Sequence, residues 1–324
     1  MCEGCFAMKA PFPWFGGKSS VAADVWCRFG DVKNYVEPFF GSGAVLLSRP
    51  HAQHTETIND KDRFIANFWR AVRCAPEDVV KWLDWPVNEV DLTARHMWLL
   101  NEGAAILARC DGEPDFYDAK VAGWWCWGVC SWIGSGWCSG KGPWSWDTQD
   151  HVWLDRRQLP HVGNAGRGIN RKLPHVGDAG ACEERTKYLH LLLRELSDRL
   201  RGVRVCCGDW SRVCGPSVTT RHGLTGVFLD PPYPDSAERA ANLYATDCDR
   251  VADAAAAWAL SEGGNPKMRI AFCGYEGTTN FPSSWSVLEW KSKGGFGSQG
   301  AVDGRGRANA SRERIWFSPH CLEK

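Results

Sequence analysis

The sequence lacks net charge, because 38 lysine and arginine residues balance 38 aspartate and glutamate residues. Any surface that binds nucleic acid must therefore be local, since the chain as a whole does not attract a polyanion. The chain also lacks an apolar run approaching the roughly 18 residues that span a membrane, and it shows no signal-peptide pattern. These absences predict a cytoplasmic protein with no membrane partner. Its 324 residues suffice for one large domain or two ordinary ones.

Grouped metal ligands are lacking as well. The fifteen cysteines are scattered along the chain, and without an export signal we expect reduced thiols, many of them buried, rather than disulfides. Cys2 and Cys5 form a lone CxxC, and Cys126, Cys130 and Cys138 cluster loosely. Neither group has a matching second pair or ligand histidines, so we expect no metal site.

Tryptophan, by contrast, is abundant, with nineteen residues. Seven of them lie between Trp124 and Trp146, in "AGWWCWGVCSWIGSGWCSGKGPWSW". The sequence leaves two interpretations of this stretch open. The rings form a wide apolar core patch, or some of them meet a ligand or DNA.

Strands and helices alternate near the start of the chain. A predicted strand over residues 35–40 enters the tight turn "GSG" at 41–43 and then a helix. A second short strand ends at Asp60, and the helical segment "KDRFIANFWRAVR" follows it. This order of strand, turn, helix, strand and acid is typical of the first half of a nucleotide-binding α/β unit.

The alternation is interrupted between about residues 75 and 200. This segment contains helical patterns, the tryptophan-rich stretch and a short repeat, "RQLPHVGNAG" at 157–166 and "RKLPHVGDAG" at 171–180. We interpret the repeat as two similar loops or a hairpin. We therefore expect a doubly wound, mixed α/β sheet of the Rossmann-like type, formed by residues 1–74 and 201–324. A largely helical and loop-rich insertion at 75–200 would divide it.

The glycine turn and the acid that follows it indicate a cofactor. Gly41 and Gly43 allow a ligand to approach the backbone closely where a strand turns into a helix. Asp60 follows Gly43 by 17 residues, near the spacing at which an acid accepts hydrogen bonds from a ribose diol. Together they predict an adenosine-containing cofactor. The alternative is a tight turn followed by a helix-capping aspartate.

The segment "VFLDPPY" at 227–233 predicts a strand that ends on a small rigid site. A nucleobase amine is a poor nucleophile, because its lone pair is delocalised into the ring. Acceptors aimed at its hydrogens, the Asp230 carboxylate and the Pro231 carbonyl, favour a pyramidal and reactive nitrogen. Pro231 and Pro232 keep the backbone rigid, and Tyr233 offers a ring for a base taken out of the helix. The alternative is a plain proline-rich turn.

The insertion carries a local excess of positive charge. Between Arg156 and Arg204 lie eleven lysine or arginine residues and five acids, which suits phosphate contacts. Within the repeat, we expect Arg157 and Arg171 to hold phosphates. The residues expected to contact bases are His161, Asn164, His175 and Asp178. The alternative is a solvated helix with an ordinary hairpin.

The segments "PWFGGK", "EPFFGSG", "IND", "CCGDW" and "DPPY" occur in this order, and over about 11–75 and 203–317 the sequence resembles the Dam-like (D12) class of adenine-N6 DNA methyltransferases. The resemblance implies S-adenosylmethionine as the cofactor. It places Trp14 and Lys18 against this cofactor, Asp60 at its ribose and Asp209 near its adenine. Its methionine end would be lined by Phe39, Gly41 and Gly43. The catalytic tetrapeptide would be Asp230, Pro231, Pro232 and Tyr233, with Asp230 also facing the cofactor.

The resemblance implies a site-specific DNA methyltransferase that transfers a methyl group to N6 of a flipped adenine in double-stranded DNA. Two alternatives stay open, which are methylation of another exocyclic amine (cytosine N4 in DNA, or an RNA base) and an inactive DNA-binding homologue. The insertion does not resemble the usual recognition region of Dam enzymes, so their GATC specificity does not carry over. The sequence is compatible with a monomer. It does not decide the recognition site, the oligomeric state, or whether the protein is solitary, phage-borne or paired with a restriction enzyme.

Overall fold

A computed structural model describes residues 8–14, 17–132, 137–138, 144–147, 152–155, 182–232, 248–290 and 312–323. The chain divides into two compact units. The sheet unit comprises Met1–Ala10, Trp14–Ala66 and Asp198–Lys324, and the helical unit comprises Pro11–Pro13 and Asn67–Ser197. The assignment of residues 75–200 to DNA recognition stays a prediction.

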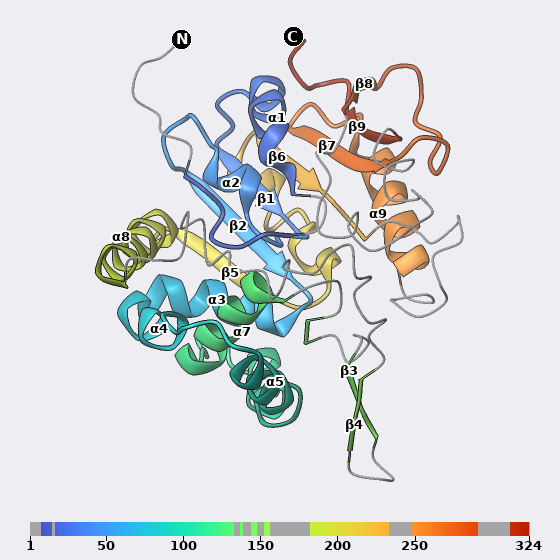
Figure 1. Cartoon of the computed structure of the whole chain (residues 1–324). Coiled ribbons are helices and arrows are strands. Elements are labelled where there is room, and N and C mark those ends of the chain that lie inside the picture. The colour runs from blue at the N-terminus through green and yellow to red at the C-terminus, as the bar shows by residue number, and fades with distance from the viewer. Residues whose placement is uncertain are drawn as a thin grey trace. The chain divides into compact units, whose positions relative to one another are not determined.

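The sheet unit is built on a mixed sheet with the strand order β5-β2-β1-β6-β7-β9-β8 (Figure 1). The strands are β1 (Asn34–Glu37), β2 (Thr55–Asp60), β5 (Val203–Cys207), β6 (Thr225–Leu229), β7 (Met268–Tyr275), β8 (Ser286–Glu289) and β9 (Glu313–Phe317). The pairs among the first five are parallel, whereas β9 is antiparallel to both β7 and β8. The predicted doubly wound, mixed α/β sheet is confirmed.

The strand order reverses between β1 and β6. From β1, the chain first adds β2 and β5 on one side, and later adds β6 and β7 on the other. In an open α/β sheet, ligands bind outside the carboxyl ends of the strands at such a switch point. The glycine turn follows β1 there, and Asp230, Pro231 and Pro232 follow β6.

Both faces of the central strands are buried. Successive side chains of a strand point to opposite faces, and other elements cover each face. Val36 of β1 and Val227 of β6 join an apolar cluster with alanines of α9 (Cys248–Glu262). On the opposite face, Tyr35 packs against Trp26 of α1 (Ala22–Phe29), with ring centroids 4.9 Å apart. Four further short elements lie in this unit: η1 (Lys18–Ser20), α2 (Ala44–Leu47), η5 (Trp210–Val213) and η6 (Thr220–His222).

The first strand is shorter than predicted. It ends at Glu37 instead of Phe40, because Pro38 has no backbone N–H with which to continue a ladder. The backbone of Phe40 still connects to the next strand, since its N–H donates to the carbonyl of Asn59 at 3.0 Å.

The helical unit contains the α-helices α4 (Pro76–Leu83), α5 (Glu89–Trp98), α6 (Ala104–Leu107) and α7 (Ala119–Ser131). It also contains the short π-helix η2 (Leu99–Gly103) and the 3-10 helix η3 (Ala108–Asp111). It also holds the antiparallel strands β3 (Trp144–Asp147) and β4 (Val152–Asp155). Two helices cross the division between the units, α3 (Arg63–Cys74) and α8 (Cys182–Leu200). The side chains of Asn88 and Asp118 cap α5 and α7 by accepting the N–H groups of Asp91 and Val121.

Part of the tryptophan-rich stretch forms the core of the helical unit. Trp125 and Trp127 are buried on α7. The Trp125 ring meets Phe12 edge to face with centroids 5.0 Å apart, and Phe12 meets Phe68 in the same way at 5.2 Å. The apolar-core interpretation therefore holds for these rings. Trp124, on the same helix, is only half-buried.

The described cysteines are all free. In the described part of the chain, no cluster of three or more histidine, cysteine, aspartate or glutamate side chains is arranged to hold a metal ion. None of the described helices is long and apolar enough to cross a membrane.

Candidate active site

The glycine turn after β1 is shaped by backbone conformation and by close packing. Gly41 and Gly43 have φ of +49° and +70°. Residues other than glycine rarely adopt such positive values. A Cβ at Gly41 would lie 2.6 Å from Cδ1 of the Trp14 indole, and one at Gly43 would lie 2.5 Å from Cζ of Phe40. Both glycines are therefore required where Trp14 and Phe40 lie against the turn.

Asp60 at the end of β2 supports this turn. Its Oδ2 accepts the N–H of Gly41 at 3.0 Å, and its Oδ1 accepts the N–H of Asp62 at 2.9 Å. Burial raises the pKa of the Asp60 carboxyl to about 7, and the charge of Asp62 acts in the same direction. The side chain of Asp62 accepts the N–H of Phe64 at the start of α3. The hydrogen bond to a helix N-terminus is therefore made by Asp62, not by Asp60.

Asn59 joins three strand ends, a role that the sequence analysis missed. Its buried side-chain amide donates to the carbonyl of Pro38 after β1 and to that of Gly208 after β5, each at 3.0 Å. The N–H of Gly208 in turn donates to the carbonyl of Asp60 at 3.1 Å. The motif "IND" marks this position, but the partners of the amide depend on the order of the strands.

Lys18 and Asp230 form the central ion pair of the site. Lys18 Nζ lies 2.7 Å from Asp230 Oδ2, and the lysine side chain is 4% exposed. Burial alone would lower the pKa of Lys18, but the charges around it, chiefly that of Asp230, outweigh this effect and raise the pKa. The two residues are 212 positions apart in the sequence, and the sequence analysis placed Lys18 only against the cofactor.

Glu37 and Trp290 surround this pair and were not predicted. Burial raises the pKa of Glu37 well above its usual range, although its hydrogen bond from the Tyr35 hydroxyl at 2.7 Å opposes the shift. The charges of Asp230 and Asp60 also raise the pKa of Glu37. The ring centroid of Trp290 is 5.5 Å from Lys18 Nζ, within the range of a cation–π contact.

Asp209 lies after β5, exposed at the carboxyl end of the sheet. It accepts hydrogen bonds from the N–H and the hydroxyl of Ser211, and these lower its pKa. The next residue, Trp210, stacks on Phe39 with ring centroids 6.0 Å apart. The chain that leaves β5 and the chain that leaves β1 are therefore in contact through these rings.

The structure brings most of the predicted cofactor residues to one edge of the sheet. Trp14, Gly41 and Asp60 are linked by direct contacts, and Asp209 follows the Gly208 backbone that bonds to Asp60. Pro231 is buried and Pro232 is exposed. The remaining predicted site residues lie outside the described residues, namely Tyr233, Arg157, His161, Asn164, Arg171, His175 and Asp178.

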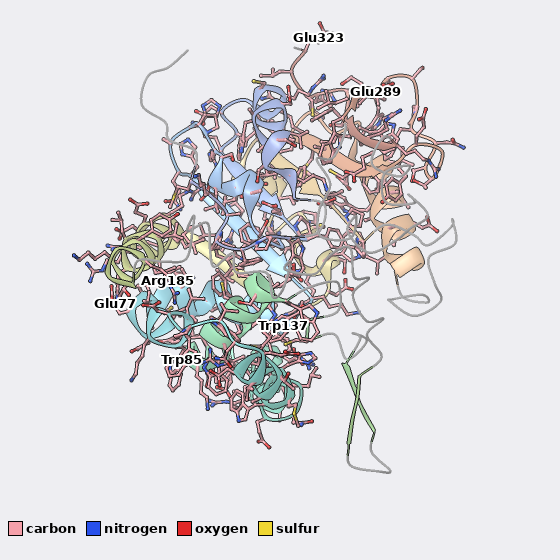
Figure 2. All side chains as sticks on the ribbon, in the orientation of Figure 1. Glu77, Trp85, Trp137, Arg185, Glu289 and Glu323 are labelled. Carbon is pink, nitrogen blue, oxygen red and sulfur yellow. The ribbon has the colours of Figure 1, made fainter. Side chains whose placement is uncertain are left out.

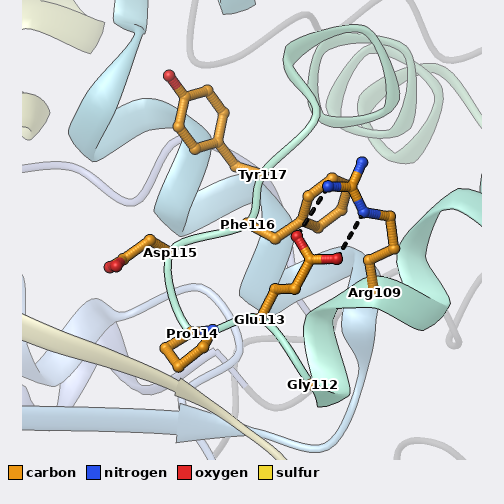
Figure 3. Close-up of a pocket in the computed structure, with 7 residues that line it drawn as sticks. All are labelled: Arg109, Gly112, Glu113, Pro114, Asp115, Phe116 and Tyr117. Atoms are coloured by element: carbon orange, nitrogen blue, oxygen red, sulfur yellow. Dashed lines mark hydrogen bonds and ion pairs between the residues drawn. The ribbon is translucent and has the colours of Figure 1, made fainter.

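An open depression in the helical unit is unrelated to these residues. It is lined by Arg109, Gly112, Glu113, Pro114, Asp115, Phe116 and Tyr117 (Figure 3). The Arg109 guanidinium pairs with Glu113 at 2.7 Å and lies 4.2 Å from the Phe116 ring centroid. Its charge is therefore satisfied within its own loop, and none of the predicted site residues lines the depression.

Comparison with known families finds one similarity. Residues 14–89 match the family described as D12 class N6 adenine-specific DNA methyltransferase. Over these residues the chain is similar to the D12 class. The match includes the glycine turn, Lys18 and Asp60, and the "DPPY" segment lies beyond it. The family supports DNA adenine methylation in general. No curated protein matches the chain.

Proposed function

We propose that this protein transfers a methyl group from S-adenosylmethionine to N6 of an adenine turned out of double-stranded DNA. The observation that carries the proposal is the Lys18–Asp230 pair, which holds a carboxylate at the switch point of the sheet beside the glycine turn. A cytoplasmic location and double-stranded DNA as the partner are part of this proposal.

The residues around the turn fit this cofactor. Gly41 and Gly43 have no side chains, so a ligand can approach the backbone of the turn. Asp60 offers acceptors for a ribose diol, and Asp209 is an exposed acceptor after the neighbouring strand β5. S-adenosylmethionine, when bound, supplies a methyl group on a positively charged sulfur. The Trp14 indole and the stacked Phe39 and Trp210 rings provide apolar walls around that edge.

Asp230 is the group that we propose acts on the target amine. The Nζ of Lys18 lies 2.7 Å from Asp230 Oδ2. Asp230 Oδ1 and the Pro231 carbonyl would each accept one hydrogen of the N6 amine. Acceptors fixed in advance stabilise the positive charge that develops on the nitrogen as the methyl group arrives. The methylated nitrogen then loses one proton, which passes to the Asp230 carboxylate or to water.

The proposal is tested by incubating the purified protein with S-adenosylmethionine labelled in its methyl group and with bacterial genomic DNA. Mass spectrometry of the digested DNA should find the label in N6-methyladenine. Label in N4-methylcytosine would support the alternative amine, and unlabelled DNA would contradict a methyltransferase function.

The matched variant is Asp230→Ala. It should lower the rate of transfer by on the order of a hundredfold or more. Its affinity for S-adenosylmethionine, measured by calorimetry, should change little because the proposed partner of Asp230 is the amine. Near-normal turnover would show that the tetrapeptide is not catalytic.

A further inference from the structure

Three helices of the helical unit, α4, α5 and α7, are labelled in Figure 1. Lysine and tryptophan side chains of these helices contact one another. Lys120 Nζ of α7 lies 4.0 Å from the ring centroid of Trp98, 4.4 Å from that of Trp124 and 5.6 Å from that of Trp82. Lys81 Nζ lies 5.7 Å from the Trp82 ring. We call these five residues the tryptophan–lysine face.

Local sequence and helix packing explain this arrangement. Lys120 and Trp124 are four residues apart and therefore share one side of α7. Gly123 lets α7 approach α4 closely, since a Cβ there would lie 2.5 Å from Cβ of Trp82. Trp124 meets Trp82 and Trp98 edge to face, with centroids 5.9 and 5.1 Å apart.

The charges of this face are not neutralised within the described residues. No carboxylate there forms an ion pair with Lys81 or Lys120. Three arginines of the helical unit are paired, by contrast, in the bridges Arg109–Glu113, Arg185–Asp84 and Arg194–Glu77. Asp78, an exposed acid of α4, does not pair with the two lysines, and Glu77 of the same helix pairs with Arg194.

A third cation extends the face inward. The Arg95 guanidinium is buried and lies 4.3 Å from the ring centroid of Trp127 and 5.0 Å from those of Trp85 and Trp124. Its NH1 has no hydrogen-bond partner in the described part of the chain. Trp85 is 45% exposed at the surface of the helical unit (Figure 2). The tryptophan rings here surround positively charged side chains, whereas a purely apolar core would contain no charge.

We propose that the tryptophan–lysine face is a contact surface for DNA, in which Lys81 and Lys120 bind backbone phosphates. The tryptophan rings hold the ammonium groups by cation–π contact without cancelling their charge, so the charge stays available to a polyanion. Half-buried rings beside these ammonium groups also present apolar area to sugars and bases. This inference rests on the proposed function, because that function supplies DNA as the partner.

The test uses the full-length protein and fluorescein-labelled duplexes cut from bacterial genomic DNA. Lys81→Gln/Lys120→Gln should weaken binding to every duplex sequence, by roughly tenfold or more at low salt. The slope of log affinity against log salt should become shallower by up to about two phosphate contacts. Lys81→Arg/Lys120→Arg keeps the charge and should retain the slope of the original protein. Affinity for S-adenosylmethionine should be unchanged in both variants.

Lys267→Gln is the matched control. It removes the same charge from an exposed lysine next to the amino end of β7, far from the carboxyl-end site, and should leave the salt slope unchanged. A normal slope and affinity in the Gln/Gln variant of a protein that still methylates DNA would overturn the surface and leave the proposed function standing. A protein that binds DNA with the expected loss in the Gln/Gln variant, yet never methylates it, would support the surface and contradict the function. A protein that neither binds nor methylates DNA would overturn both.

Discussion

At the scale of single residues, Asp60 combines two tasks that the sequence could not separate. Its carboxylate holds the N–H of Gly41 and so shapes the glycine turn, and it is also the proposed acceptor for the ribose. Each carboxylate oxygen can accept more than one hydrogen bond, so the two tasks are compatible. The pKa of about 7 makes the second task sensitive to pH.

We expect the affinity for S-adenosylmethionine to rise between pH 6 and pH 8. Below about pH 7 the Asp60 carboxyl is protonated and becomes a poorer acceptor for the diol, so the affinity should fall by up to about tenfold per pH unit. Calorimetry across this range measures the effect, and Asp60→Asn should show a flat profile. A pH-independent affinity in the unmodified protein would contradict the assignment.

The raised pKa of Asp60 makes the folded state less stable as pH rises, whereas a salt-bridged acid makes it more stable. The folded pKa of Asp60 is raised above the value of about 3.9 expected in the unfolded chain. The folded state therefore binds the proton more tightly, and this contribution to stability is lost as pH rises from about 4 to 7.

Asp60→Ala should weaken cofactor binding by roughly 10- to 150-fold, because hydrogen bonds to a charged group contribute about 1.5–3 kcal/mol. Asp62→Asn is the neighbouring control, since the Asp62 side chain serves the start of α3. Measured above pH 8, where Asp60 is ionised whatever the charge of Asp62, that control should leave the cofactor affinity unchanged. Unchanged calorimetric binding in Asp60→Ala would show that Asp60 only supports the turn.

Lys18→Met separates the two roles open to this lysine. If Lys18 acts by positioning Asp230, the rate of methyl transfer should drop by on the order of a hundredfold, while the affinity for S-adenosylmethionine changes little. If it contacts the cofactor directly, as the family resemblance implies, the affinity should fall in step with the rate. Lys33→Met, at an exposed lysine paired with Asp31 at 3.4 Å, should change neither quantity.

At the scale of elements, glycine decides how closely α7 and α4 pack. Gly123→Ala would place a Cβ 2.5 Å from Cβ of Trp82 and 2.8 Å from the carbonyl oxygen of Val79. Overpacking of this kind costs about 1–3 kcal/mol, which we expect to exceed the gain of about 1 kcal/mol in helix propensity. Urea unfolding should therefore show a lower midpoint.

The control for this prediction lies in the same unit. A Cβ added at Gly112 would have no atom within 4 Å, and the φ of this residue is −107°, so Gly112→Ala should change stability by no more than about 0.5 kcal/mol. An unchanged midpoint in Gly123→Ala would mean that α4 and α7 separate without cost. The tryptophan–lysine face would then not depend on their close approach.

At the scale of the whole molecule, the site is assembled from segments that the helical unit separates in sequence. Lys18 and Asn59 precede that unit, whereas Gly208 and Asp230 follow it, and parallel pairing brings them to one edge of the sheet. The charge that DNA requires is local in the same way. The helical unit as a whole has no excess of lysine and arginine over acids, so this charge is confined to the tryptophan–lysine face and to the basic segment between Arg156 and Arg204.

We expect the repeat to contact both the phosphates and the bases of the DNA. Arg157→Ala/Arg171→Ala should weaken binding to all duplexes and make the salt dependence shallower by up to about two phosphate contacts. Replacing Asn164 and Asp178 should instead relax which site is methylated, since a bidentate base contact discriminates by about 1–3 kcal/mol. Methylome sequencing of both variants measures this. An unchanged site and salt slope in both would place recognition outside the repeat.

The sequence by itself determined the features that depend on local backbone chemistry. The turn at Gly41 and Gly43 requires positive φ, and two consecutive prolines after Asp230 require a rigid strand end, so both were predictable without any partner. Alternation of strands and helices likewise predicted the doubly wound sheet. Such signals are short-range and stay readable in the linear chain.

Only the tertiary structure decided which side chains meet. Lys18 pairs with Asp230, Asn59 bonds to Pro38 and Gly208, and Trp290 lies beside Lys18. These contacts join residues far apart in the chain, so they follow from strand order, which no local pattern states. The tryptophan stretch shows the same limit. Trp125 is a core residue because its ring packs against Phe12, whereas the ring of its neighbour Trp124 contacts the ammonium group of Lys120. The difference arises because adjacent residues of a helix face different surroundings.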